Sequence, residues 1–367
     1  MAHIIITTSN NLVFDNRVHK VTSTLLKAGH TVWRTGRNWP RPHVNAKRPG
    51  HTVLFSLPFR KGPLFYLSLN IYLFFFLLRH RFDVVWAVDM DTLPASRLAA
   101  ILKRKPVIFD SHEFFSEVPE LQKSRWKKNF WKFLEKQLIP GCDIKLTVSP
   151  GLIELYKKKY NCQFGLLMNL PFKNPAAVCS PTQTSPPVIL YQGSLNVGRG
   201  LPETIRAMEH LPGYIFRIVG DGDCTEELKA LTTSLGLNDR VEFTGPVPFE
   251  ELHLHHKNVM VGMCLLQNMG LNYYYSLPNR IFDYMQAGIP VIASDFPDMA
   301  GIIKKHQTGL LIDNLDPLTI AETIRKACEN TKWRKKWMKT LPATARELCW
   351  ENEEQTIQSL PPLNDHE

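Results

Sequence analysis

Short apolar runs alternate with longer amphipathic stretches along most of the chain. In the first part, the runs rich in β-branched residues are IIIT, HTVWRT, DVVWAV, PVIFDS and DIKLTVS. The segments between them repeat apolar residues at helical spacing and predict helices near residues 16–28, 92–104 and 123–138. Alternation of this kind indicates parallel strands joined by crossover helices, the α/β class.

The pattern is interrupted once, where NPAAVCSPTQTSPP shows no periodicity and is rich in proline, serine and threonine. A second series of strands and helices follows it, and 367 residues exceed what one core usually serves. We therefore expect an N-terminal Rossmann-like domain at 1–172, a linker at 173–187 and a second Rossmann-like domain at 188–345. Residues 346–367 are expected to form a C-terminal helix that packs back on the first domain.

Two of the helical stretches are unusual, one in being almost wholly apolar and the other in being amphipathic and basic. Residues 64–78 are almost wholly apolar, but these fifteen residues fall short of the roughly 20 that span a bilayer, so we expect a buried or interfacial helix. Residues 123–138 place Trp126, Phe130 and Phe133 among lysines at helical spacing. That helix either rests on anionic lipid or packs its apolar side on the domain with its lysines in water, and the sequence leaves both open.

The net charge of +10 allows nucleic acid, an anionic membrane or a phosphorylated substrate as partner. Nucleic acid is not expected, because the basic residues are spread over helices without a recognised binding module.

Seven scattered cysteines, with no close pair, favour a reducing cytoplasm as the compartment. The apolar run at residues 4–6 has no charged leader, so it is interpreted as a first strand rather than a signal peptide.

Glycine-rich loops follow two strands of the second domain. In YQGSLNVGRGLPETI, Gly193, Gly198 and Arg199 precede a helix, a pattern that can cradle a phosphate under a guanidinium. An ordinary glycine turn with a solvated arginine is the alternative. In IVGDGD, Gly220 and Gly222 would let a flat ring approach the backbone, and a plain turn is again the alternative. The spacing matches neither an ATPase P-loop nor a nicotinamide fingerprint.

The strongest local signal is SLPNRIFDYMQAGIPVIASD, which predicts a helix stopped by Gly288. Asn279 and Asp283 share one face of this helix, next to Arg280. A carboxylate in this place can accept two ribose hydroxyls while the guanidinium meets phosphates. The segment therefore predicts a nucleotide-binding site.

Taken in order, these motifs resemble the retaining glycosyltransferases of family 4, over nearly the whole chain. The first-domain part of the resemblance is carried by S-N-x-x-x-x-D-N-R-V-x-K, VDMDTL and FDSHEFFSEVPEL. The resemblance implies the GT-B fold, in which two doubly wound parallel-sheet domains face an interdomain cleft.

The resemblance also implies a role for particular residues. Arg199 and Arg280 would hold the donor diphosphate, and His112 would meet the transferred sugar. His112 follows the strand PVIFDS, at the edge where such sheets bind ligands, although a hydrogen-bonded loop histidine is the alternative. The implied donor-binding residues are Gly193, Ser194, Gly198, Gly220, Gly222, Asn279 and Asp283. The implied residues of the acceptor or cleft loops are Asp15, Asn16, Arg17, Asp110 and Glu113.

One position departs from the family pattern. Many relatives carry two glutamates eight positions apart; Asp283 matches the second, whereas Tyr275 stands at the first.

Two Asp-x-Asp triplets, at 89–91 and 221–223, could suggest a metal site, but paired carboxylates of this kind are common at strand ends. We expect no metal cofactor, because two arginines and a helix dipole already supply positive charge.

The expected reaction is the transfer of a sugar from a nucleotide-diphosphate donor, the co-substrate, to a hydroxyl of a glycan or lipid-linked acceptor, with retained configuration. The expected location is the cytoplasm, with peripheral contact with an anionic membrane left open. Two alternatives are kept: a nucleotide-sugar epimerase or hydrolase of the same fold, and a noncatalytic binding subunit.

Overall fold

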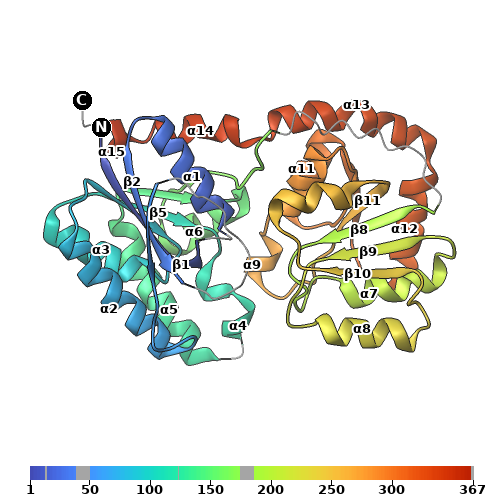
Figure 1. Cartoon of the computed structure of the whole chain (residues 1–367), viewed down its shortest axis with the longest axis horizontal. Coiled ribbons are helices and arrows are strands. Elements are labelled where there is room, and N and C mark those ends of the chain that lie inside the picture. The colour runs from blue at the N-terminus through green and yellow to red at the C-terminus, as the bar shows by residue number, and fades with distance from the viewer. Residues whose placement is uncertain (13–14, 39–49, 123, 174–185, 365–367) are drawn as a thin grey trace. The chain divides into compact units, whose positions relative to one another are not determined.

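The chain divides into two compact units (Figure 1). Unit 1 comprises Met1–Asn169 and Glu351–Glu367, and unit 2 comprises Leu170–Trp350. The computed structural model describes residues 1–12, 15–38, 50–122, 124–173 and 186–364. Most of the expected linker, residues 173–187, therefore lies outside the described residues.

Unit 1 is built on a parallel sheet of seven strands among the described residues, in the order β3-β2-β1-β4-β5-β6-β7. The strands are β1 (His3–Asn11), β2 (Thr31–Arg37), β3 (His51–Phe55), β4 (Val84–Val88), β5 (Val107–Ser111), β6 (Ile144–Thr147) and β7 (Gly165–Leu166). Every residue of β4 and β5 is buried, as expected for parallel strands covered on both faces. The prediction of a doubly wound sheet is confirmed.

The helices of unit 1 begin and end where local chemistry favours it. The helix α1 starts after Asp15, whose carboxylate accepts a hydrogen bond from the backbone N–H of Val18, and Gly29 follows its end with a φ of 86°. The helices are α1 (Asn16–Lys27), α2 (Pro63–Arg79), α3 (Leu93–Lys103), α4 (Pro119–Gln122), α5 (Arg125–Leu138), α6 (Pro150–Tyr160), α14 (Trp350–Gln358) and α15 (Pro361–Asn364). Two short 3₁₀ turns, η1 (Phe115–Glu117) and η2 (Ile139–Gly141), flank α4 and α5.

The strongly apolar stretch at 64–78 forms α2, which is half buried. Leu69 and Leu73 point into the core, while Leu67 and Ile71 are more than half exposed. The helix is therefore only partly buried, and its contact with a membrane stays a prediction. Across the residues that are described, no helix is both long and apolar enough to cross a bilayer.

The helix α5 turns its aromatic stripe outward. Trp131 and Glu135 are buried, whereas Trp126, Phe130 and Phe133 are 64%, 51% and 58% exposed. The alternative in which the apolar side packs on the domain is therefore wrong, because Trp131 alone among the four aromatic residues packs inward.

Unit 2 is built on a second parallel sheet, of six strands in the described part, in the order β10-β9-β8-β11-β12-β13. The strands are β8 (Val188–Gln192), β9 (Ile215–Val219), β10 (Val241–Gly245), β11 (Val259–Cys264), β12 (Val291–Ser294) and β13 (Gly309–Ile312). The order reverses between β8 and β11, so the carboxyl ends of these two strands form the edge where open α/β sheets bind ligands.

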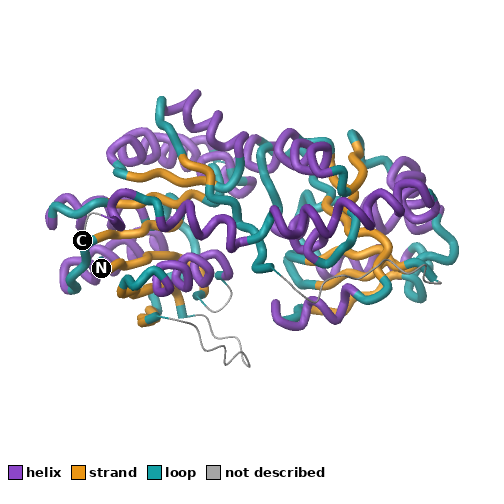
Figure 2. Tube along the Cα trace, turned by 90° about the horizontal axis from the view of Figure 1, so that it is seen from above, coloured by secondary structure: helices purple, strands orange, loops and turns teal. Residues whose placement is uncertain are grey.

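Helices flank the strands in each unit (Figure 2). Those of unit 2 are α7 (Leu201–Ala207), α8 (Thr225–Ser234), α9 (Leu271–Tyr274), α10 (Asn279–Gln286), α11 (Pro297–His306), α12 (Pro317–Glu329) and α13 (Thr331–Glu347), with the 3₁₀ turns η3 (Met208–His210) and η4 (Phe249–His256). The helix α10 agrees with the helix that was expected to stop at Gly288.

Candidate functional site

The Arg280 side chain lies at the carboxyl edge of the unit 2 sheet. Arg280 is only 8% exposed, and its guanidinium carbon lies 4.4 Å from the centre of the Tyr191 ring, near the end of β8. The next loop passes beside it: a Cβ added to Gly193 would lie 3.7 Å from the same carbon. Because Gly193 has no side chain, its loop can pass close to the guanidinium.

A second guanidinium lies close to the same strand ends. Arg199, in the loop between β8 and α7, has its guanidinium carbon 5.0 Å from the centre of the Tyr273 ring. Burial raises the pKa of the Cys264 thiol, while Arg280 and Arg199 oppose that rise, so both cations act on the end of β11. The structure thus brings together the two arginines that the sequence predicted.

Both arginines have unused hydrogen-bond donors. Nε of Arg199 and Nη1 of Arg280 are buried and have no hydrogen-bond partner within the described part of the chain. A buried donor without a partner is costly, and the cost is larger for a charged group. Two such cationic donors at one sheet edge are well suited to anionic oxygen atoms.

Asp283 is held by a chain of side chains that the sequence did not reveal. Nε2 of Gln192 donates to Oδ2 of Asp283 at 3.1 Å, and Oε1 of Gln192 lies 2.8 Å from Nε2 of His256. Burial, together with neighbouring histidines, lowers the pKa of His256 to about 4, so the ring is neutral near pH 7. Since the Gln192 oxygen can only accept, Nε2 of His256 carries the ring proton and donates it.

Gln192 and His256 fit no short motif, and their partnership joins β8 to η4 across the sheet. The one available signal in the sequence was Gln192, a polar residue at the end of an apolar strand run.

Two further positions singled out in the sequence lie nearby in the chain. Asn279, at the start of α10, is exposed, and Tyr275, at the end of α9, is partly buried.

The predicted glycines allow two loops to meet backbone to backbone. Gly220 has a φ of 143°, and a Cβ there would lie 2.0 Å from the Gly193 carbonyl oxygen. A Cβ on Gly222 would lie 2.6 Å from the Leu195 nitrogen, and one on Gly198 would lie 2.4 Å from the Met269 sulfur. Glycine is thus required here by the fold itself, and a role of these loops toward a base stays a prediction. The backbone carbonyl of Ser194 accepts a hydrogen bond from the Tyr191 hydroxyl.

In unit 1, His112 lies between two carboxylates at the ends of β4 and β5. Its Nδ1 is 3.6 Å from Oδ2 of Asp89, its Nε2 is 3.4 Å from Oδ2 of Asp110, and its backbone N–H donates to Oδ1 of Asp89 at 2.8 Å. Burial disfavours the charged imidazole, but Asp89 and Asp110 outweigh it and raise the pKa of His112. Asp89 holds this geometry with a left-handed φ of 59°.

Arg17 and Asp110 form a buried ion pair. Nε and Nη2 of Arg17 donate to the two Asp110 oxygens at 3.0 and 2.6 Å, and Nη1 donates to the Leu167 carbonyl at 2.8 Å. Burial alone would raise the pKa of Asp110, but Arg17 and then His112 hold that pKa well below its usual range. Arg17 therefore fixes the carboxylate that faces His112, so we interpret it as a positioning residue.

The other predicted residues of unit 1 are placed around this pair. Asp15 caps α1, and its second oxygen accepts a hydrogen bond from Asn10 at 3.0 Å. Asn16 is the first residue of α1 and is partly exposed, and the Glu113 side chain is exposed beside His112 in sequence. Their role toward an acceptor stays a prediction.

The Asp-x-Asp triplets have local roles. Burial, followed by the Asp89 carboxylate, raises the pKa of Asp91 to about 7. Oδ1 of Asp221 accepts hydrogen bonds from the Gly222 N–H and from the Thr225 hydroxyl at the start of α8. Apart from the undescribed segments, the chain has no group of three or more His, Cys, Asp or Glu side chains that could hold a metal ion.

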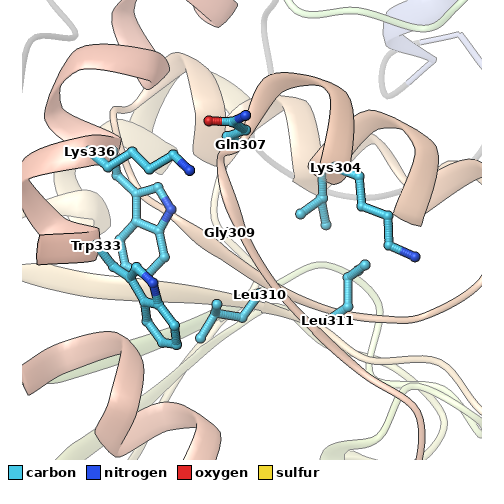
Figure 3. A pocket seen from close by; sticks show the side chains of 9 residues that line it. Lys304, Gln307, Gly309, Leu310, Leu311, Trp333 and Lys336 are labelled. Carbon is cyan, nitrogen blue, oxygen red and sulfur yellow. The ribbon is translucent and has the colours of Figure 1, made fainter. Parts of the chain in front are cut away.

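Unit 2 also has a hollow of about 260 Å³ formed by α11, β13 and α13 (Figure 3). Trp333 and Lys336 stand on one side of it and Lys304 on the other, above Leu310 and Leu311. Its lining residues include none of those predicted for the functional site.

Comparison with known proteins agrees with the two-unit division. The family profile described as "Glycosyltransferase Family 4" matches residues 15–165, and the profile described as "Glycosyl transferases group 1" matches residues 179–342. In structure, Anabaena HepE in complex with UDP and glucose is similar over 98% of this chain and 100% of its own, with 15% identity and a TM-score of 0.74. The fold is therefore GT-B, and the class of protein is a glycosyltransferase.

The chain belongs to the group 1 glycosyltransferases of family 4. It is 23% identical over 71% of its length to a Campylobacter jejuni enzyme, "GalNAc-alpha-(1->4)-GalNAc-alpha-(1->3)-diNAcBac-PP-undecaprenol alpha-1,4-N-acetyl-D-galactosaminyltransferase". It is 24% identical over 67% of its length to the Mycobacterium tuberculosis "GDP-mannose-dependent alpha-(1-6)-phosphatidylinositol monomannoside mannosyltransferase". The matches span 68% and 58% of these relatives' own lengths.

Proposed function

We propose that the chain transfers a sugar from a nucleotide-diphosphate donor to a hydroxyl of a glycan or lipid-linked acceptor, with retained configuration. One observation carries the donor assignment: two cationic side chains with buried, unpartnered donors lie at the switch point of the unit 2 sheet. A guanidinium pairs well with phosphate oxygens, because its planar fork donates two parallel hydrogen bonds.

The relatives support the chemical class of both substrates. HepE was solved with UDP and glucose, and the mycobacterial relative is named as GDP-mannose-dependent. The names of the Campylobacter and mycobacterial relatives describe acceptors that contain undecaprenol diphosphate and phosphatidylinositol. For this chain, the base, the sugar and the acceptor are to be found by experiment.

In the proposed reaction, the acceptor hydroxyl attacks the anomeric carbon from the face that the diphosphate leaves. The bond from the anomeric carbon to the leaving phosphate oxygen breaks, and that oxygen takes the proton of the hydroxyl. Arg199 and Arg280 stabilise the charge that grows on the diphosphate, and Asp283 binds the ribose. No metal ion and no separate base are part of the proposal. The compartment proposed is the cytoplasm, on the ground of the seven dispersed cysteines.

The donor assignment is tested by binding. A thermal-shift screen of UDP-, GDP-, ADP- and CDP-sugars identifies the donor, because a ligand that binds only the native state raises the melting temperature. Arg280→Ala should then weaken donor binding by about 10- to 150-fold, the loss of one hydrogen bond to a charged group. Arg206→Ala removes an exposed arginine of α7 and should bind the donor as the unchanged protein does. Equal affinity of the two variants would contradict the assignment.

The reaction is tested by product analysis with and without acceptor. NMR of the product should show the donor's anomeric configuration in the new linkage. Free sugar or an altered donor sugar formed without acceptor would instead support the hydrolase or epimerase. Donor binding without any turnover, across an acceptor panel, would support the noncatalytic subunit and would fit Tyr275 in place of an acid.

A further inference from the structure

Three neighbouring helices of unit 1 expose an unusual amount of apolar surface. On α2, Leu64, Leu67, Ile71 and Phe75 are each about half exposed, and they follow one another at helical spacing. On α3, Leu98, Ile101 and Leu102 are exposed by 51%, 54% and 59%. The outward aromatic stripe of α5 completes what we call the α2–α3–α5 face.

These side chains are exposed because the opposite sides of the helices are already packed. Phe76 and Leu77 of α2 pack with Ile5 and Val85 of the sheet and with Ala99 of α3. α3 also contacts α5, and the three helices lie next to one another in Figure 1. The core is therefore complete without the exposed residues.

The helix α5 is tied to the same layer through its one inward aromatic residue. The Trp131 ring lies 5.0 Å from the Tyr66 ring of α2 and 4.5 Å from the Phe115 ring. Trp131 therefore ties α5, which carries the exposed aromatic stripe, to α2.

The charges on this face have one sign. α2, α3 and α5 together contain a single acidic residue, Glu135, which is fully buried and bonded to the Tyr160 hydroxyl and the Ser116 N–H. Basic side chains flank the aromatic stripe instead: Arg125 and Lys136 are exposed, and Lys127 lies beside Trp126.

The remaining lysines of α5 share one carboxylate. Lys128 and Lys132 lie 2.7 and 3.7 Å from the carboxylate of Glu117, which also pairs with Lys159. Hydrogen bonds from Lys128 and Lys159 hold the pKa of Glu117 low despite its burial. One carboxylate balances only one of these three ammonium groups, so the cluster adds net positive charge to that of Arg125, Lys127 and Lys136.

We propose that the α2–α3–α5 face docks the protein on an anionic lipid bilayer. Exposed apolar patches of this extent mark interaction surfaces, and aromatic residues flanked by lysine and arginine suit the headgroup boundary. The purely basic rim favours anionic over zwitterionic lipid, because each Lys or Arg near an anionic surface gains about 1 kcal/mol. The proposal does not depend on the transfer reaction, since lipid binding requires neither donor nor acceptor.

The first test is co-sedimentation of the full chain with vesicles of phosphatidylcholine, with and without phosphatidylglycerol. The protein should sediment with the anionic vesicles and be released by high salt. Phe130→Ser/Phe133→Ser should weaken partitioning roughly 100-fold, at about tenfold for each large apolar side chain. Leu254→Ser/Leu318→Ser, a pair on unit 2 that is similarly exposed, should partition unchanged.

The second test separates charge from apolar contact. Arg125→Gln/Lys127→Gln/Lys136→Gln should lose about fivefold in partitioning per charge on anionic vesicles, and its partitioning should depend less steeply on salt. Circular dichroism and melting curves check that each variant is folded.

Sedimentation that is the same for the Phe130/Phe133 pair as for the unchanged protein would overturn the proposal. So would a dimer in solution that the same two substitutions dissociate, combined with no vesicle binding, because the face would then join two copies of the chain. Loss of lipid binding with normal donor affinity would leave the proposed function intact.

Discussion

Replacing Arg17 by methionine tests whether the buried ion pair with Asp110 holds unit 1 together. Both side chains are at most 2% exposed, and the two hydrogen bonds between them are the shortest contacts that the carboxylate makes. Methionine fills a similar volume without charge. Asp110 would keep only Trp86 Nε1, at 3.2 Å, and the His112 ring as polar neighbours.

Removing one partner of a buried pair costs about 3–5 kcal/mol, because the other charge stays buried without compensation. For a unit of this size, that corresponds to a fall in melting temperature of about 6–20 °C. Differential scanning calorimetry at neutral pH should show the transition of unit 1 moving while that of unit 2 stays. Since the folded pKa of Asp110 is depressed, the pair's contribution is present above the unfolded value near 3.8 and is lost only as the pH falls through the folded pKa.

Arg17→Met/Asp110→Asn provides the matched comparison. It should recover part of the lost stability, because the uncompensated charge is gone while the amide oxygen still accepts from Trp86. A loss below about 1 kcal/mol in the single variant, the size of an exposed ion pair, would refute the reasoning. It would mean that water reaches Asp110 once the guanidinium is removed.

Two further predictions concern the loops and the histidine. Gly220→Ala should lower the melting temperature of unit 2 by at least about 4 °C, because its Cβ would collide with the Gly193 carbonyl. The control is Gly213→Ala, which also changes a glycine at positive φ but has open space around it, and it should lower the melting temperature less. Equal shifts in the two variants would contradict the close approach of Gly220 to Gly193. NMR titration of the His112 ring should show a pKa above its ordinary value of 6.5, and Asp89→Asn should bring it down. The stabilisation that charged His112 provides is therefore expected below pH 6.5 and should fade as the pH rises through the folded pKa; a ring that titrates at the same pH in both proteins would refute the assigned cause.

Much of the fold could be predicted because buried parallel strands are continuous apolar runs. β3 was not predicted: its residues are mostly exposed at the sheet edge, so His51–Phe55 shows neither a continuous nor an alternating pattern. The outward side of α5 could not be predicted either, since periodicity identifies a stripe but not the surface that it meets. The two arginines of unit 2 were predicted because glycine residues mark the loop that holds Arg199 and Pro278 marks the start of the helix that holds Arg280. Gln192 and His256 were not, because their contact depends on how distant segments meet.

The order in which the chain is made differs from the order in which unit 1 is completed. Glu354 of α14 contacts Lys27 and Thr24 of α1, and Glu353 accepts a hydrogen bond from the Met168 N–H. All of unit 2 must leave the ribosome before these contacts can form, a delay on the order of ten seconds at ordinary rates of synthesis. During that interval, unit 1 is held together without these contacts. The nascent N-terminal unit should therefore gain its final stability only after the last residues of the chain have been translated.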